Sequence, residues 1–149
     1  MDALLSIVLP LLAGLVVFLL VMRGIMALVR RSLYRRIRRK FAGQTIVRMS
    51  IGANFFGQTS RGLGQIRGNG ALVLTPNQLY FALFAPRREL TIQLDNVVSL
   101  STPRVHLGKT VGAKLLRVDF RADGGEDAAA WAVRNLEEWV SDIERYRGH

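Results

Sequence analysis

The sequence predicts an α+β protein: an N-terminal transmembrane helix followed by an antiparallel β-barrel or sandwich of six or seven strands closed by one C-terminal helix. Residues 3–22 carry no charge, and twenty helical residues rise about 30 Å, the thickness of a bilayer's hydrocarbon core. From Gly43 onward apolar residues alternate with polar ones, which is the period of a strand. Near the end of the 149-residue chain the period returns to that of an amphipathic helix.

The uncharged segment has the features of a permanent anchor and lacks those of a cleaved signal peptide. A secretory signal starts with bases, has an apolar run of about 7–15 residues and closes on a small-residue cleavage site. Here the chain starts Met1-Asp2, the apolar run is longer, and a basic tract follows it with no Ala-x-Ala pattern. We therefore expect residues 1–22 to be a transmembrane anchor.

The positive charge is concentrated beside this anchor. The formal net charge is +10, of which residues 1–40 contribute +7 and residues 41–149 only +3. Because Lys and Arg collect on the cytoplasmic flank, we expect a single-pass protein of the plasma or inner membrane, with its N-terminus outside and its C-terminal domain cytoplasmic. The distribution argues against a nucleic-acid partner, since the high charge does not belong to the folded domain.

Residues 23–43 are expected to form a basic, amphipathic juxtamembrane helix. One apolar stripe recurs at spacings of three or four, and Ala42-Gly43 provides a stop: Met26, Val29, Leu33, Ile37 and Phe41. Seven bases are predicted to lie at the membrane surface beside anionic lipid: Arg30, Arg31, Arg35, Arg36, Arg38, Arg39 and Lys40. Because the span already fixes the protein, topology and helix orientation are favoured over a specific lipid or nucleic-acid site.

Residues 44–149 are expected to form one separable domain of short strands. Alternation is clearest over 89–94 and 114–121, and further strands are predicted at 45–51, 71–75, 79–84, 96–101 and 128–133, with turn residues between them. A closing helix is predicted to start at an Asn135 N-cap, with Glu138 completing a capping box. Its apolar stripe comprises Leu136, Trp139, Val140 and Ile143.

Strands followed by one amphipathic helix resemble the pleckstrin-homology superfold. Gly70, Leu72, Leu74 and Thr75, followed by Leu79 and Phe81, look like the Gly-x-Leu-x-Leu-Thr…Leu-x-Phe hairpin of its GRAM branch, and Trp139 matches the tryptophan of the closing helix. The resemblance covers residues 44–147 and implies a binding module. Phosphoinositide-binding members carry a Lys-x(n)-Lys/Arg-x-Arg signature between their first two strands, where this chain offers only Arg61 and Arg67.

Catalytic and metal-binding patterns are absent from the sequence. There is no Cys, His106 has no nearby His or Cys with which to share a metal, and no Ser-His-Asp set has a suitable spacing. Residues 103–110 lack the first glycine of a phosphate-binding loop, and a strand follows them where a helix is required, so we expect a hairpin turn. Asp127 is assigned to a turn. We therefore predict no enzyme, no cofactor and no metal site.

Two functions remain open. In the first, the protein is a tethered adaptor that grips a cytosolic protein. In the second, its domain reads the headgroup of an anionic phospholipid through basic loop residues: Arg61, Arg67, Arg87, Arg88 and Lys109. A headgroup site needs three or more of these bases on one rim, whereas scattered bases favour the adaptor. Phe55-Phe56 is either core or an exposed edge for a partner.

Overall fold

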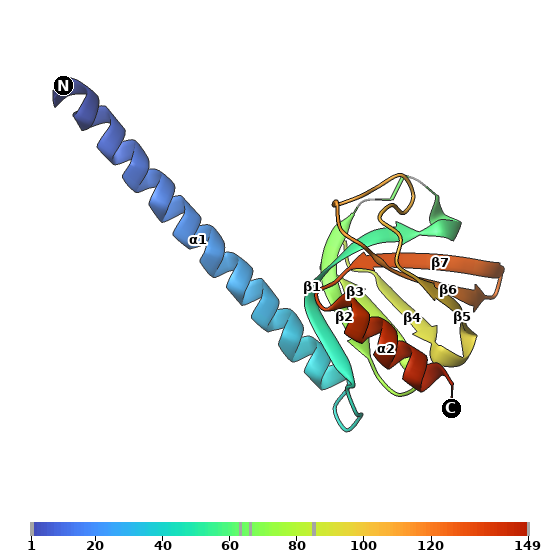
Figure 1. Ribbon diagram of the computed structural model, residues 1–149. Helices are drawn as coiled ribbons and strands as arrows, with labels where there is room; N and C mark the ends of the chain where they lie inside the picture. Colours follow the sequence, from blue (N-terminus) through green and yellow to red (C-terminus); the bar gives the residue numbers. More distant parts are fainter. Residues whose placement is uncertain (1, 63, 66, 85, 149) are drawn as a thin grey trace.

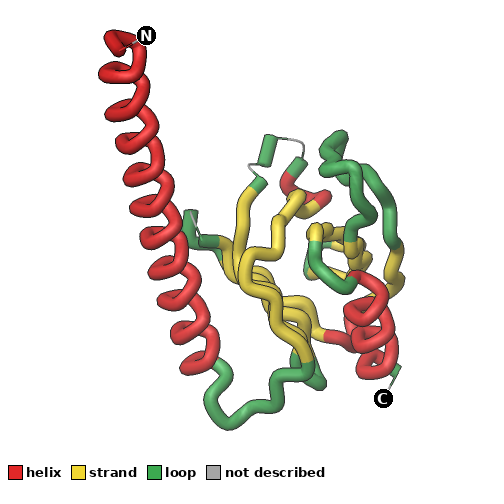
Figure 2. Tube along the Cα trace, turned by 60° about the vertical axis from the view of Figure 1, so that its left-hand side comes forward, coloured by secondary structure: helices red, strands yellow, loops and turns green. Residues whose placement is uncertain are grey.

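One long helix and a β-domain make up the chain. The computed structural model describes residues 2–62, 64–65, 67–84 and 86–148. Helix α1 (Asp2–Lys40) stands out as a shaft, and only its C-terminal part lies against the β-domain (Figure 1). The last element is α2 (Leu136–Arg147), on the other side of the sheet from α1 (Figure 2).

The β-domain is a seven-stranded antiparallel sheet. Its strands follow the order β4-β3-β2-β1-β7-β6-β5, so neighbours in the chain are mostly neighbours in the sheet. Within the described residues β4 and β5 remain unpaired edges joined by a short 3-10 turn, η2 (Leu94–Asn96), so the sheet does not close into a hydrogen-bonded barrel. The strands are β1 (Arg48–Gln58), β2 (Gly68–Leu74), β3 (Gln78–Leu83), β4 (Glu89–Gln93), β5 (Val97–Ser101), β6 (Leu116–Ala122) and β7 (Gly125–Ala132).

The predicted fold class is confirmed, and the strands predicted after the first are present, including the last one at 128–133. The first strand was placed wrongly, because it starts three residues later and runs seven residues further than the predicted 45–51. Register shifts between Ile51 and Ala53 and between Phe55 and Gly57 interrupt its alternation. Gly52 (φ +98°) and Gly57 (φ +120°) adopt the backbone that these bulges require. A period-two pattern cannot be followed through two bulges.

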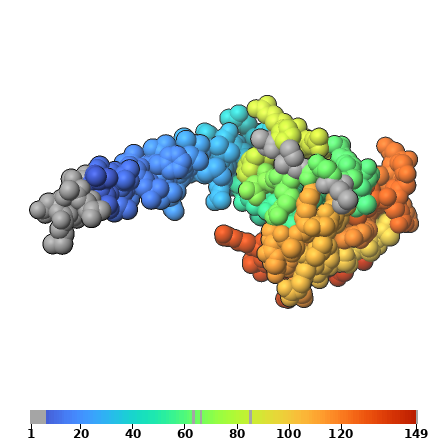
Figure 3. Space-filling model, turned by 90° about the horizontal axis from the view of Figure 1, so that it is seen from above, coloured from blue at the N-terminus to red at the C-terminus, as the bar shows by residue number. Residues whose placement is uncertain are grey.

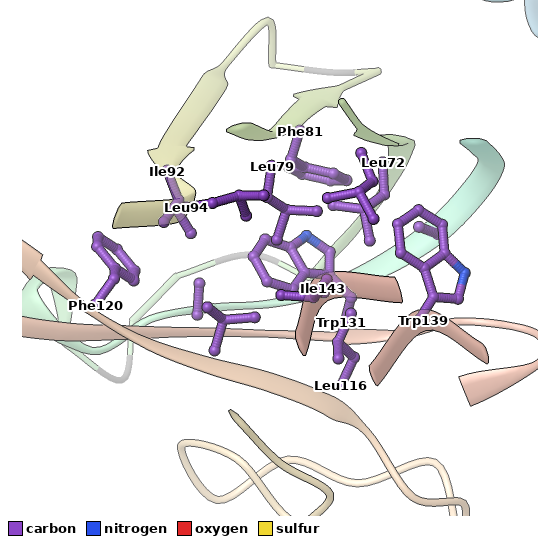
Figure 4. Close-up of a cluster of buried hydrophobic side chains, with 14 of the residues drawn as sticks. Leu72, Leu79, Phe81, Ile92, Leu94, Leu116, Phe120, Trp131, Trp139 and Ile143 are labelled. Atoms are coloured by element: carbon purple, nitrogen blue, oxygen red, sulfur yellow. The ribbon is translucent and has the colours of Figure 1, made fainter. Parts of the chain in front are cut away.

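The inner core lies between the sheet and α2. Trp131 of β7 and Trp139 of α2 are both buried, and the aliphatic residues of β2, β3 and β6 surround them (Figure 4). Trp139 was predicted to lie on the apolar stripe of the closing helix, and its burial is confirmed. Ile143, one turn after Trp139, is fully buried beside it, as the spacing of the stripe predicts.

The predicted capping box at the start of α2 is wrong. Asn135 has left-handed backbone angles (φ 54°, ψ 51°) and makes no side-chain cap; its carbonyl accepts hydrogen bonds from the amides of Glu138 and Trp139. The Glu138 carboxylate instead accepts a hydrogen bond from Arg48, and Asp142 accepts a second one. A tertiary ion pair between β1 and α2 therefore replaces the local motif.

Helix α1 packs on the outer face of the sheet. Leu33, Ile37 and Phe41 are buried there against β2 and β3, on a surface formed by Ala71, Val73, Tyr80 and Ala82. Arg36 and Lys40 flank this seam and form ion pairs with Glu89 of β4, at 2.7 and 2.5 Å. The last three residues of the predicted apolar stripe therefore form a packing seam with the β-domain across the expected boundary at residue 43, whereas Met26 and Val29 are exposed.

Candidate functional site

A cavity lies at the loop end of the β-domain, away from α2, where β1 meets the β3–β4 hairpin. Its floor is apolar and comes from four residues: Phe55, Phe81, Leu83 and Leu90. The Phe55 ring centroid lies 5.0 Å from that of Phe81 and 5.7 Å from that of Trp131, so the inner core supports the floor. This loop-end cavity has a volume of about 80 Å³.

Phe55 and Phe56, which the sequence left as either core or an exposed edge, differ in their burial. Phe56 is fully buried, whereas Phe55 is only partly buried and lines the loop-end cavity. One ring is thus core and the other forms a candidate binding surface. Adjacent residues of a strand point to opposite faces, which accounts for the split.

Two of the five predicted headgroup residues meet at the rim of the cavity. Arg61, at the end of η1 (Thr59–Arg61), and Arg88, just before β4, line it together with Gln58, Gln65 and Glu89. Within the described ranges, neither guanidinium has a hydrogen bond or an ion pair. The green segment around Arg61 and the yellow-green segment around Arg88 lie side by side in Figure 3.

The other three predicted headgroup residues do not join this rim. The Arg67 guanidinium lies 4.3 Å from the Phe56 ring centroid and donates to the Thr110 carbonyl at 3.4 Å. Lys109 donates to the Gln65 carbonyl, so its charge holds the loop in place. Arg87 is exposed and does not line the loop-end cavity. The expected cluster is therefore a pair of arginines.

Hydrogen bonds pin the loop that carries Arg61. The Gln65 side chain accepts from the amide of Gln58 at 3.0 Å and donates to the Gly62 carbonyl at 2.8 Å. Buried Asp127 accepts from the amide of Ser60 at 2.9 Å and from its hydroxyl at 2.7 Å. The sequence assigned Asp127 only to a turn, because these partners lie 67 residues away.

The charge state of Asp127 follows from these contacts. Burial by itself raises the pKa of this carboxyl, but hydrogen bonds from Ser60, Gln58 and Ala128 outweigh burial and leave the pKa below its ordinary value. The carboxylate therefore stays ionised at neutral pH and acts as a fixed acceptor that orders η1 and positions Arg61.

The segment that resembles a phosphate-binding loop is a hairpin turn, as predicted. His106 and Lys109 form an isolated antiparallel bridge, and Leu107 (φ 49°) and Gly108 (φ 71°) make the turn between them. The buried His106 ring lies 3.2 Å from the Gly57 carbonyl oxygen through Nε2. Burial lowers the pKa of His106, so the ring is neutral at physiological pH and packs the hairpin onto β1.

The seven bases of α1 are divided among different surroundings. Arg36 and Lys40 pair with Glu89, and the Arg38 guanidinium lies 5.8 Å from the Tyr34 ring centroid. Arg31, Arg35 and Arg39 are exposed. Arg30 lines a groove between α1 and the sheet. The seven bases therefore differ in their contacts within the described chain, and their place at a membrane surface stays a prediction.

One helix of the described chain is long and apolar enough to cross a membrane. It is the part of α1 from Ile7 to Lys40, near the N-terminus, and its most apolar stretch is not buried against the rest of the protein. Leu9, Leu11, Leu20 and Leu28 are each more than 60% exposed. By length and composition this is a candidate membrane span.

Comparisons with solved structures find structural similarity at low sequence identity. No family model matches this sequence, and no curated protein matches it either. The C-terminal domain of an unknown protein from Leishmania infantum is similar in structure, with a TM-score of 0.57 and 13% identity over 80% of this chain and 98% of that domain. The Vps36 N-terminal PH domain gives a TM-score of 0.49 and 13% identity over 71% of this chain and 80% of that domain.

Proposed function

We propose that this chain is a membrane-anchored, non-catalytic binding module, a tethered adaptor whose β-domain holds a segment of a cytosolic protein at the membrane surface. The loop-end cavity is the observation that carries the proposal. It combines an apolar floor with two arginines that have no partner in the described chain, and a pinned loop presents one of them. A preformed apolar pocket with a charged rim is what a short peptide needs.

The size of the cavity sets the ligand class. Sites for drug-sized molecules and cofactors enclose about 300–1,000 Å³, whereas this one encloses about 80 Å³. It therefore suits one apolar side chain of a partner. An acidic residue next to that side chain would pair with Arg61 and Arg88, since guanidinium groups bind carboxylates through two parallel hydrogen bonds.

The anchor and the resemblance to pleckstrin-homology and GRAM domains complete the proposal. The uncharged run of residues 3–22 and the bases that follow it within α1 favour one crossing of the plasma or inner membrane, with the β-domain in the cytoplasm. Protease added to sealed right-side-out cells is expected to leave the β-domain intact. Its digestion there would overturn the orientation.

Recognition of an anionic phospholipid headgroup is the second candidate. One observation favours it: the loops that carry Arg61 and Arg88 lie on the side of the β-domain from which the N-terminal part of α1 extends (Figures 1 and 2). Two arginines are fewer than the three or more bases that selective reading of one headgroup requires, so the adaptor is the better supported function.

Substituting the rim arginines separates the two candidates. The full-length chain is purified from its own membrane, and co-purifying proteins are quantified by mass spectrometry. We expect Arg61→Ala with Arg88→Ala to reduce one specific partner by about tenfold or more, because both charges face the bound segment. The matched control is Arg87→Ala with Arg121→Ala, which removes the same charge outside the cavity.

The contrary outcome is equally specific. If the partner profile is unchanged, the adaptor proposal fails at this cavity. If the rim variant instead loses a preference for one anionic lipid over another of equal charge, while the control retains it, the headgroup candidate takes its place. Native mass spectrometry of the purified chain with added lipids measures that preference.

A further inference from the structure

A second polar groove lies between α1 and the sheet, just beyond the point where the helix separates from the β-domain. Its polar lining comes from four separate parts of the chain: Arg30 of α1, Ser50 and Asn54 of β1, Asn69 of β2, and Arg134 of the β7–α2 turn. We call it the tether groove. It is distinct from the loop-end cavity, and its open volume is about 480 Å³.

Residue spacing along α1 explains why Arg30 lies on the helix side of the groove. Arg30 precedes the buried Leu33 by three positions and the buried Ile37 by seven, so it lies on the docked face, one turn beyond the packing seam. Arg36 and Lys40 lie on the other flank of that seam, where Glu89 neutralises them. Arg30 has no such acidic neighbour among the residues described.

On the sheet side of the groove, the residues on the outer face change from apolar to polar beyond the packing seam. Met49 and Ile51 of β1 pack in the cluster under α1. The bulge at Gly52 shifts the alternation, so that Asn54 follows them on the outer face, directly across from Asn69 of β2. Arg134 is two residues beyond Ala132, which pairs with Asn54, so the turn brings a second exposed guanidinium to the same place.

The electrostatics of the tether groove are unbalanced. Both guanidinium groups lack a hydrogen bond and an ion pair to any described residue, and no acidic side chain is among the described residues that line the groove. The amides of Asn54 and Asn69 add neutral donors between the two charges. Two planar cationic forks with amide donors between them match the oxygens of a phosphate group.

The position along α1 selects the source of that phosphate. Arg30 lies eight residues after Met22, the end of the uncharged run, which is about 12 Å along the helix. A long arginine side chain reaches back toward the headgroup layer from such a depth. Helix α1 diverges from the β-domain toward its N-terminus (Figures 1 and 2). The tether groove, which Arg30 lines, therefore lies next to the diverging part of the helix.

We propose that the tether groove binds the phosphate of an anionic phospholipid, which is held between Arg30 of the anchor helix and Arg134 of the β-domain. The bound headgroup bridges helix and domain and holds the domain against the membrane surface. The inference rests on the membrane anchor of the proposed function and is independent of the loop-end cavity, so substitutions at Arg30 and Arg134 can fail without affecting the result for Arg61 and Arg88.

The test is native mass spectrometry of the full-length chain in mild detergent with added phosphatidylglycerol or phosphatidylcholine. We expect Arg30→Gln with Arg134→Gln to weaken phosphatidylglycerol binding by at least about tenfold and to leave phosphatidylcholine binding unchanged. Lys114→Gln with Arg121→Gln is the matched control. It removes the same charge from exposed positions of the β-domain outside the groove, and we expect a change of less than about twofold.

Thermal unfolding checks that the variants fold. Neither pair of substitutions should change the unfolding temperature, because all four side chains are exposed. Equal losses in the two variants, or no loss in the groove variant, would overturn the proposal. Inorganic phosphate at matched ionic strength separates the possible sources. We expect that inorganic phosphate does not displace phosphatidylglycerol. Displacement would show that the groove binds phosphate but would overturn the assignment of that phosphate to a lipid.

Discussion

Two helices pack on the same sheet, one on each side, and they serve different purposes. Helix α2 buries Trp139 and Ile143 in the inner core, whereas α1 buries Leu33, Ile37 and Phe41 on the outer face. Strand β2 lies beneath both, with Leu72 and Leu74 facing the inner core and Ala71 and Val73 facing α1. Five consecutive residues of β2 are buried, because both faces of this strand are covered.

The packing of α2 on the inner face of the sheet (the inner seam) and that of α1 on its outer face (the outer seam) differ in the size of their residues. They also differ in their contribution to the stability and orientation of the β-domain. The inner seam combines two tryptophans with large aliphatic residues, so it supplies most of the stability of the β-domain. The outer seam sets Ile37 and Phe41 on small residues, Ala71 and Ala82, which let the helix approach the sheet closely. In the proposed function, the packing of α1 on the β-domain fixes how that domain faces the membrane. A flexible linker would leave that orientation free.

Breaking the inner seam has the largest expected effect. Trp139 is 2% exposed, with the Arg48 guanidinium 5.9 Å from its ring centroid. Trp139→Ala is expected to lower the free energy of unfolding by about 3–5 kcal/mol. Denaturant titration of the full-length chain in mild detergent, followed by the fluorescence of Trp131, measures the loss. Val105→Ala, at an exposed site, is the control, and a loss below about 1 kcal/mol for Trp139→Ala would remove that residue from the core.

Removing the outer seam completely tests whether α1 belongs to the β-domain. A chain of residues 43–149 lacks Leu33, Ile37 and Phe41 and leaves the apolar outer face of β2 and β3 uncovered. We expect it to self-associate, whereas a chain of residues 30–149 remains monomeric. Analytical ultracentrifugation compares the two. A monomeric, stable chain of residues 43–149 would make residue 43 the domain boundary and the seam dispensable.

Weakening the outer seam at one residue has a smaller effect. Ile37 is fully buried, and Ile37→Ala is expected to reduce the free energy of α1 docking by about 2–4 kcal/mol. Hydrogen exchange at the amides of residues 33–41 reports the opening. The same substitution at Leu28, which is 66% exposed on the same helix, should leave that exchange unchanged. Similar exchange in both variants would argue against docking.

The ion pairs beside the outer seam give the smallest effect. Lys40, through its hydrogen bond to Glu89, holds the pKa of this carboxyl below its usual range. The lowered pKa means that Glu89 stabilises the folded state above its unfolded pKa of about 4.3 and loses this contribution as the pH falls through its folded pKa. Since Arg36, Lys40 and Glu89 are partly exposed, Glu89→Gln should cost less than about 1 kcal/mol at pH 7.

A pH series checks this last prediction. Docking of α1, followed by hydrogen exchange at residues 33–41, should weaken between about pH 5 and pH 3 in the original chain. That weakening should be reduced in Glu89→Gln, because the substituted side chain does not titrate. A dependence of equal size in both proteins would assign it to other carboxyl groups.

Local and periodic features were determined by the sequence alone. The uncharged run of residues 3–22, the alternation of the strands and the stripe of α2 each depend on near neighbours, so they were predicted correctly. Trp139 was placed on the buried face of α2 by its spacing from Leu136, Val140 and Ile143, and it is buried. The bulges of β1 were missed, because each changes the register that a periodic pattern assumes.

Only the tertiary structure decided which residues meet. The stripe of α1 was visible in the sequence, but its partner, the outer face of β2 and β3, lies 30 to 49 residues further along the chain. The meeting of Arg61 with Arg88, and of Arg30 with Arg134, depends in the same way on contacts between distant segments. Spacing along one element places a residue on a face, but what covers that face depends on how separate elements pack, and no local period carries that information.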